Sequence, residues 1–332
     1  MELNLIAGSS PHLRSKVSTS SIMRDVIIAL MPALAASIYF FGLRAFLVIL
    51  VTVLACVIAE MAANKFMKKA ITISDYSAVV TGILLAFNLP PGIPLWIAAL
   101  GGLFAIVIVK HMFGGLGHNF VNPALAARAF LMASWPVAMT TWVNPGLDAV
   151  ASATPDAMAS ATPLALIKTG TEAAGSLPHL MDLFIGNVGG CIGETSVLAL
   201  LIGAAYLVYR RIITLEIPLS FIGTTALLTW TLGGTTLFTG NFVYHIFAGG
   251  LMLGAFFMAT DYTTSPITSR GKLIMGTGCG LLTAVIRLYG GYPEGVSYSI
   301  LLMNLTVPLI DAYTIPKKFG IAKKSGGEKA NA

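Results

Sequence analysis

Apolar runs close to 20 residues long recur along the chain, and short polar breaks separate them. A run of this length can cross the hydrocarbon core of a bilayer as a helix. Ten runs fit this description: residues 22–42, 46–63, 76–89, 94–110, 122–142, 191–209, 215–233, 242–260, 273–289 and 296–313. The pattern predicts an all-α polytopic membrane protein with about ten transmembrane helices.

The longest polar break follows the fifth run, so five predicted helices precede it and five follow it. Four regions are expected: a first membrane half, an extramembrane loop, a second membrane half and a tail, at residues 1–142, 143–190, 191–315 and 316–332. Because each half has an odd number of helices, a repeat of five helices would be inverted. Such repeats place a binding site near the membrane midplane.

The 20 Lys and Arg residues are divided unevenly between alternate breaks. With the N-terminus in the cytoplasm, 16 of them fall on the cytoplasmic side, and Arg128 lies within the fifth run. Only Arg44, Lys168 and Arg287 fall on the other side. Basic loops stay in the cytoplasm. We therefore expect both termini on the cytoplasmic side of the cell membrane and residues 143–190 on the opposite side.

Composition supports this class and excludes others. Hydrophobic residues make up 56% of the chain and charged residues 10%, against about 25% charged in soluble domains. The net charge of +6 follows from the basic loops, so no nucleic-acid partner is expected. Cys56, Cys191 and Cys279 are too widely spaced to form a zinc or iron–sulfur site within this chain. No metal site and no nucleophile–base pair is predicted.

Two segments are too polar and glycine-rich for lipid-facing helix, residues 114–128 and 186–196. Irregular backbone at membrane depth is tolerated where it is buried in protein or lines a cavity. Close helix packing through glycine is an alternative explanation. However, glycine packing does not require Asn122, Arg128 or Glu194, whose polar groups suit a flat heteroaromatic ring or an ion path.

The loop between the halves contains a near-duplication, in which residues 148–155 and 156–163 both end in Thr-Pro. Proline disfavours helical geometry in the residue before it, which exposes the hydroxyls of Thr154 and Thr162. Composition alone favours an ordinary solvated loop rich in small residues.

Several segments in order resemble one known family. They are Asp156 with Ala-Thr162-Pro-Leu, then residues 114–124, 193–196, 287–298 and 304–311. Together they look like the D-type membrane component of Rnf-type electron-transport complexes, and like the related B-type component of the sodium-translocating NADH:quinone reductase. The likeness covers nearly the whole chain.

The resemblance implies FMN joined through its phosphate to Thr162, outside the membrane, by a separate flavin transferase. Asp156, Ser160 and Pro163 belong to the implied attachment motif. Ala159 stands where the family motif often has serine or threonine, so Thr154 remains an alternative acceptor. The wider family also holds a noncovalent flavin (riboflavin) within its helices. The candidate residues for it are Asn119, Asn122, Arg128, Gly193, Glu194 and Thr195.

The implied function is that of a subunit, not catalytic alone, in an oxidoreductase between ferredoxin and NAD that moves Na+ or H+. Its partners would be other membrane and peripheral subunits, including another flavin-bearing subunit and iron–sulfur subunits. Membrane-embedded residues that could serve an ion path, or could be purely structural, are Glu60, Arg128, Glu194, Asp261 and Asp311. The alternative function is a ten-helix secondary transporter or channel without redox chemistry.

Overall fold

A computed structural model describes residues 18–69, 72–145, 162–168, 177–234, 236–292 and 294–316. Every regular element in these ranges is helical. The all-α prediction is therefore confirmed for the part of the chain that the structure describes.

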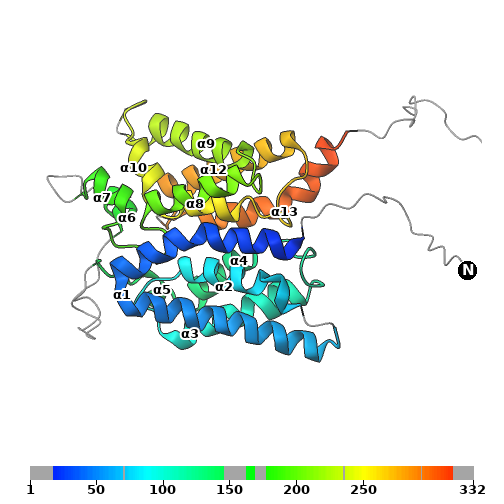
Figure 1. The fold of residues 1–332 in the computed structure, drawn as a ribbon. Coiled ribbons are helices and arrows are strands. Elements are labelled where there is room, and N and C mark those ends of the chain that lie inside the picture. Colours follow the sequence, from blue (N-terminus) through cyan, green and yellow to red (C-terminus); the bar gives the residue numbers. More distant parts are fainter. Residues whose placement is uncertain are drawn as a thin grey trace, which may run out of the picture.

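The first half of the chain begins with a helical hairpin. Helix α1 (Thr19–Phe66) reverses direction at Gly42, whose φ of 65° lies in the left-handed region that glycine tolerates. Figure 1 shows its two arms running in opposite directions, and they coincide with the first two apolar runs. The following elements are η1 (Ile73–Asp75), α2 (Ser77–Phe87), α3 (Leu95–Leu103), the π-helix η2 (Phe104–His111), α4 (Pro123–Ser134) and α5 (Pro136–Thr140).

The second half begins with two short helices and ends with two long ones. Its described elements are α6 (Pro163–Lys168), α7 (Leu180–Ile185), α8 (Val197–Tyr209), α9 (Glu216–Leu232), α10 (Phe242–Phe247), α11 (Leu251–Leu253), the π-helix η4 (Gly254–Met258), α12 (Ser269–Tyr289) and α13 (Val296–Thr314).

Two apolar runs are less regular than the pattern predicts. The run at 191–209 becomes helical only at Val197, because the Ser196 side chain accepts the Ala199 N–H (3.3 Å) and caps the helix there. The run at 242–260 breaks between α10 and α11, where Gly249 has a φ of +69°. Both breaks leave irregular backbone inside the bundle.

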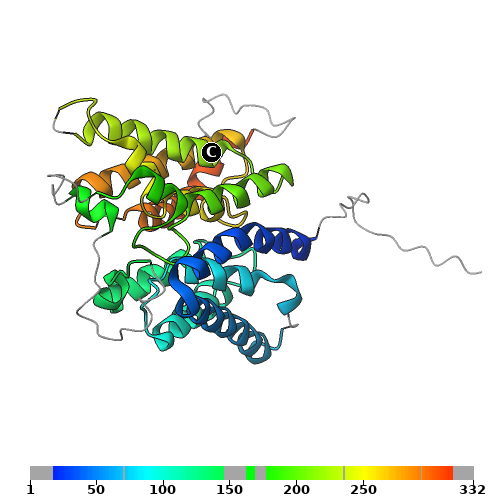
Figure 2. The same cartoon turned by 60° about the vertical axis from the view of Figure 1, so that its left-hand side comes forward.

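The two halves of the chain form two layers. Figure 2 shows the blue to teal helices of the first half below the green to red helices of the second. Helix α8 crosses to α1 so closely that a Cβ on Gly203 would lie 2.0 Å from the Ala29 carbonyl oxygen. In the second layer, α9 packs along α12. The buried apolar core is continuous through both layers.

Three described helices are long and apolar enough to cross a membrane: α1, α12 and α13. Shorter apolar helices lie at residues 77–87, 95–111, 123–134 and 197–209. The first turn of α1 and the last turn of α13 lie at one end of the bundle (Figure 1). Helices α5, α6, α7 and α10 lie at the opposite end, which we call the Thr162 end.

Candidate functional site

Arg128 lies at the centre of the most connected polar cluster that the structure describes. It projects from α4 and is only 4% exposed. Five side chains accept hydrogen bonds from its guanidinium: Asn88 (2.9 Å), Glu194 (3.2 Å), Ser297 (2.8 Å), Cys191 (3.6 Å) and Glu294. A guanidinium has five N–H donors in a planar fork, so one side chain can tie together several segments.

The partners of Arg128 come from three other places in the chain. Asn88 follows the last turn of α2, Cys191 and Glu194 lie in the irregular segment before α8, and Glu294 and Ser297 flank the start of α13. Each of these places is a helix end. The cluster therefore joins the two layers of the protein where their helices are interrupted.

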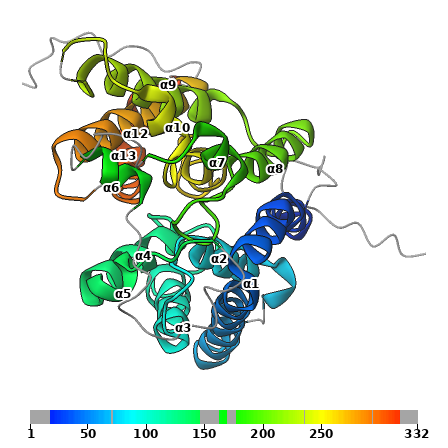
Figure 3. The ribbon, with the colours of Figure 1, turned by 90° about the vertical axis from the view of Figure 1, so that its left-hand side faces the viewer.

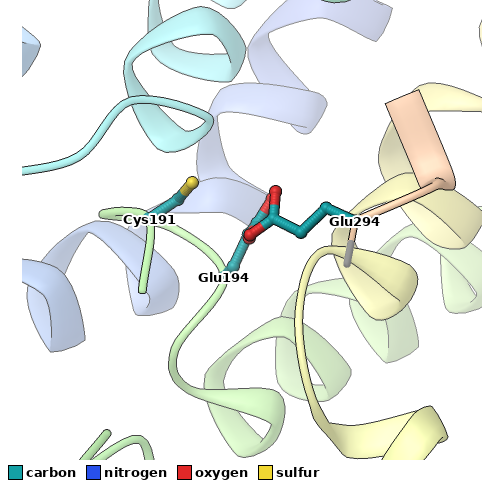
Figure 4. A group of neighbouring side chains, drawn as sticks. All are labelled: Cys191, Glu194 and Glu294. Atoms are coloured by element: carbon teal, nitrogen blue, oxygen red, sulfur yellow. The ribbon is translucent and has the colours of Figure 1, made fainter. Parts of the chain in front are cut away.

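Glu194 and Glu294 place two carboxylates beside one another, and Figure 4 shows their carboxylates meeting. With the Cys191 thiol they form a group of metal-ligand type, whose ligand atoms all lie within 4.8 Å of one another. Arg128 donates a hydrogen bond to each of the three. The guanidinium is thus the cation that this group holds, and one negative charge remains in excess when both carboxylates are ionised.

A cavity of about 290 Å³ opens beside the cluster. Arg128, Glu294 and Ser297 form its polar wall. Three aromatic residues, Trp142, Tyr292 and Tyr298, also line the cavity, and the rings of Tyr292 and Tyr298 lie 6.3 Å apart, tilted by 32°. Aromatic faces beside a few polar groups are typical of sites for flat ligands.

Thr162 borders this cavity. It stands immediately before α6, which Pro163 begins, and its hydroxyl accepts the Ala165 N–H (3.3 Å). The side chain is 5% exposed. At the far end of α6, the Lys168 ammonium donates to the carbonyls of Gly290 and Tyr292 (3.4 Å for the latter). These bonds hold α6 against the chain that leads into α13.

Three residues of the attachment motif cannot be compared with the structure. Asp156, Ser160 and the alternative acceptor Thr154 lie outside the described residues. Pro163 is buried, and it borders a small space of about 20 Å³ together with Thr162, Glu194 and Thr195. The motif threonine and the 193–196 segment therefore meet at one place.

Gly193 has a packing role. A Cβ at this position would lie 2.1 Å from Cγ of Phe87, and the Gly193 N–H donates to the Phe87 carbonyl (3.0 Å). Ile192 makes the matching bond to the Leu89 carbonyl (3.0 Å). Only glycine lets this segment pass so close to the end of α2, which sets the position of Glu194.

The residues expected to surround a single flavin are divided between two places. Asn119 and Asn122 lie at a second cavity, of about 100 Å³, which Lys110 and Asp261 also line. The Asn122 side chain accepts the Ala124 N–H (3.1 Å) and so caps α4. Arg128, in contrast, borders the Thr162 cavity. The start of α4, at Asn122, thus lies at one cavity, and Arg128, further along the helix, lies at the other.

The second cavity is joined to a buried ion pair. The Lys110 ammonium donates to both oxygens of Glu60 (3.0 Å each) and to Ser77 Oγ (2.6 Å). Thr72 donates to the same carboxylate (2.9 Å). Lys110 was expected in a cytoplasmic loop, but the structure buries it within η2, where Glu60 neutralises its charge.

Sequence reasoning missed six residues of the Arg128 cluster and its cavity: Asn88, Trp142, Tyr292, Glu294, Ser297 and Tyr298. Four of them lie within residues 287–298, which the resemblance had marked without assigning a role to any residue. Their proximity to Arg128 depends on the antiparallel approach of α4 and α13, which no local pattern encodes.

Comparisons with known proteins all point to one family, and the matches cover nearly the whole chain. The model of the NQR2, RnfD, RnfE family matches residues 6–320. The chain is 53% identical, over 99% of both sequences, to the D subunit of the Na(+)-translocating ferredoxin:NAD(+) oxidoreductase complex of Acetobacterium woodii. It is 49% identical to the D subunit of the proton-translocating ferredoxin:NAD(+) oxidoreductase complex of Clostridium ljungdahlii, over 94% of this chain and 95% of that one. It is 38% identical to the D subunit of the ion-translocating oxidoreductase complex of Escherichia coli, over 95% and 98%.

Proposed function

Because this chain belongs to the NQR2, RnfD, RnfE family, we propose that it is the flavin-carrying membrane subunit of an ion-translocating ferredoxin:NAD oxidoreductase complex. In this proposal FMN is joined to Thr162 by a phosphoester, and electron transfer through the complex drives Na+ or H+ across the membrane. One observation carries the proposal: the motif threonine borders a cavity with aromatic walls, next to the Arg128 cluster.

The residues around Thr162 suit a flavin nucleotide. Trp142, Tyr292 and Tyr298 offer faces for stacking a flat ring, and the guanidinium of Arg128 lies at the polar wall of the same cavity. Lys168 lies six residues after the acceptor, at the end of the same short helix. Its ammonium donates to the Gly290 and Tyr292 carbonyls and so holds α6 beside the cavity.

Thr162 supplies the nucleophile for attachment. Its hydroxyl oxygen forms a P–O bond to a flavin dinucleotide, while the pyrophosphate bond breaks and a nucleoside monophosphate leaves. The hydroxyl proton passes to a base of the flavin transferase. Since Thr162 is 5% exposed with α6 in place, attachment requires α6 to be displaced from the Gly290 and Tyr292 carbonyls or to dock afterwards.

Once bound, the flavin supplies electron transfer in steps of one or two electrons. Because Thr162 directly precedes α6, the chain would limit how far a flavin attached there can move. Trp142 and Met132 are both 8% exposed and exclude water from the cavity wall. Arg128, held by its two carboxylates at the cavity wall, would need little reorganisation if the charge of a flavin bound there changed.

The membrane topology in this proposal has ten crossings, two inverted halves, both termini in the cytoplasm and the Thr162 end outside. The common location of the start of α1 and the end of α13 supports an even number of crossings. Lys110 and Arg287 are buried and so do not count as loop residues. Without them, 15 basic residues remain on the cytoplasmic side and 2 on the other side. The asymmetry of the remaining basic residues still supports the orientation.

We further propose a second, noncovalent flavin at the cavity of Asn119 and Asn122. Asn119 donates to Thr263 (3.0 Å) and Asn122 to the Met258 carbonyl (3.3 Å) at its wall. Asn122 and Arg128 are six residues apart on α4, which corresponds to about 9 Å along the helix axis. Two flavins bound at these cavities would be neighbours, on a path from the Thr162 end toward the opposite end.

In-gel fluorescence tests the covalent site. The full chain is expressed with a flavin transferase, denatured, separated on a gel and viewed under ultraviolet light. Wild type and Thr154→Ala are expected to fluoresce, and Thr162→Ala is expected to be dark. Fluorescence lost only in Thr154→Ala would move the attachment site to the first copy of the repeat. No fluorescence in any sample would favour the transporter hypothesis.

Cysteine labelling tests the topology. A thiol reagent that cannot cross the membrane is expected to reach a cysteine introduced at Ser160, but not one introduced at Ser325 of the tail. Matched labelling after membrane permeabilisation serves as the control for accessibility. The reverse pattern in intact cells would contradict the proposed orientation.

A further inference from the structure

A second solvent-accessible space of about 210 Å³ lies on the other side of α6 from the Thr162 cavity. We call it the basic groove. Its ionisable lining residues are Lys168 from α6, His245 from α10 and Arg287 from α12. No Asp or Glu is among the described residues that line it. Figure 3, which looks onto the Thr162 end, shows α6, α10 and α12 lying together there.

Two buried nitrogen atoms belong to residues of the groove wall and have no hydrogen-bond partner among the described residues. Arg287 is 3% exposed; it donates to the carbonyls of His245 and Ala248, but its Nε has no hydrogen-bond partner in the part of the chain that the structure describes. The Nδ1 of His245, which is 4% exposed, has none either. Buried polar groups are nearly always paired, so these two atoms are available to a partner other than the described residues.

Arg287 has no ion-pair partner among the described residues, although Glu194 and Glu294 act on its charge from a longer distance. Both glutamates are engaged by Arg128. A buried charge without a counter-ion costs several kcal/mol. Lys168 adds a second positive charge and uses two of its three N–H donors on Gly290 and Tyr292. Among the described lining residues, an anion entering the groove would meet two cations and no carboxylate.

The apolar rim of the groove indicates which anion fits. Leu232 ends α9 and Tyr289 ends α12, and they are 45% and 71% exposed. Leu288 lies beside them. Exposed apolar and aromatic residues at the ends of membrane helices lie at the level of lipid headgroups. A positively charged groove with an apolar mouth at that level suits a phosphate that carries acyl chains.

We propose that the basic groove binds the phosphate of an anionic phospholipid at the Thr162 end of the protein. The phosphate oxygens accept a hydrogen bond from the exposed Lys168 ammonium, and the buried Arg287 guanidinium and His245 imidazole lie in the wall of the groove behind it. The acyl chains leave along Leu232, Leu288 and Tyr289. Because Lys168 also holds α6, the bound lipid steadies the helix that begins beside Thr162.

Native mass spectrometry of the full chain, purified in detergent without a flavin transferase, tests this site separately from flavin attachment. Phosphatidylglycerol, phosphatidylcholine and inorganic phosphate are titrated in turn. We expect one phosphatidylglycerol to bind more tightly than either of the other two. Lys168→Gln should weaken that binding by about fivefold, the value of one basic residue near an anionic headgroup. Lys65→Gln, an exposed lysine on α1, should leave it unchanged.

Arg287→Lys and His245→Asn extend the test to the buried groups. Both are expected to weaken phosphatidylglycerol binding more than they weaken phosphatidylcholine binding. If Arg287→Lys does not fold, the exposed Lys168 carries the test alone. Equal binding of phosphatidylglycerol by wild type and Lys168→Gln would overturn the proposal, and so would equal affinity for phosphatidylcholine. Inorganic phosphate binding as tightly as phosphatidylglycerol would rule out a lipid as the source of the anion.

Discussion

Two buried arginines in this protein have opposite surroundings. Arg128 is 4% exposed and donates to two carboxylates, an amide, a hydroxyl and a thiol. Among the described residues, Arg287, which is 3% exposed, donates to two backbone carbonyls, and its Nε has no partner. The first is fully paired from within the chain, whereas the second retains the capacity to bind an anion from outside.

This difference separates a structural centre from a binding group. A buried charge that is paired within the protein fixes the segments around it, and removing it leaves its partner charges buried without compensation. A buried charge that is bonded only to carbonyls has no partner charge to strand. Accordingly, Arg128 belongs to the framework of the Thr162 cavity, and Arg287 is the group we assign to a lipid phosphate.

The largest effect is expected from Arg128→Met. The substitution leaves Glu194 and Glu294 buried without their cation, at a cost of about 3–5 kcal/mol in the free energy of unfolding. The melting temperature of the full chain in detergent measures it. Glu194→Gln combined with Arg128→Met should recover part of the loss, because one stranded charge is removed. A melting temperature unchanged in Arg128→Met would show that the cluster does not join the two layers.

Arg287→Met should cost less. It removes hydrogen bonds to two carbonyls, of His245 and Ala248 at the end of α10. Groups left unsatisfied in this way cost about 1–3 kcal/mol each, but the loss of a buried charge that has no ion-pair partner offsets part of that cost. The same melting experiment measures this loss of stability. Phosphatidylglycerol should raise the melting temperature of wild type but not that of Arg287→Met. A greater loss of stability than in Arg128→Met would reverse the comparison between the two arginines.

Gly193→Ala tests how closely the Arg128 cluster depends on backbone position. A Cβ placed 2.1 Å from the Phe87 ring forces the segment away from α2, and overpacking of this kind costs about 1–3 kcal/mol. Phe87→Leu should not relieve this cost in the double variant, because leucine keeps the Cβ and Cγ positions that would lie 2.3 and 2.1 Å from the new Cβ. If Gly193→Ala melts like wild type, the close approach of this segment to α2 is not what positions Glu194.

Ser297→Ala should have the smallest effect of the four. It removes one of the five hydrogen-bond acceptors of Arg128, at 2.8 Å, for about 0.5–1.5 kcal/mol. Both carboxylates remain, so the charge of Arg128 stays paired. A loss as large as that of Arg128→Met would mean that the hydroxyl, and not the carboxylates, holds the guanidinium.

Much of the fold could be predicted from the apolar runs, since helix length and hydrophobicity are local properties. The reversal at Gly42 and the helices at 216–232, 269–289 and 296–314 lie close to where the pattern indicated. The breaks before Val197 and at Gly249 were harder to locate. They depend on a serine cap and on one left-handed glycine, which a hydrophobicity pattern does not register.

The candidate site was predictable only in part. An arginine within an apolar run identified Arg128, and the resemblance identified Thr162. However, Lys110 and Arg287 were counted as loop charges, because a basic residue near the end of an apolar run has the same local sequence whether it is exposed or buried. Glu294 and Tyr292 reach the cavity only through the packing of α13 against α4.

Flavin fluorescence before and after unfolding tests the central claim most directly, namely that the flavin on Thr162 lies in the cavity lined by Trp142, Tyr292 and Tyr298. Stacking against these rings should quench the flavin in the native, flavin-loaded chain, and denaturation should raise its fluorescence severalfold. Trp142→Leu, with Trp230→Leu as the matched control on α9, should reduce that rise. Equal fluorescence in the native and denatured chain, with the flavin covalently attached in both, would contradict the account.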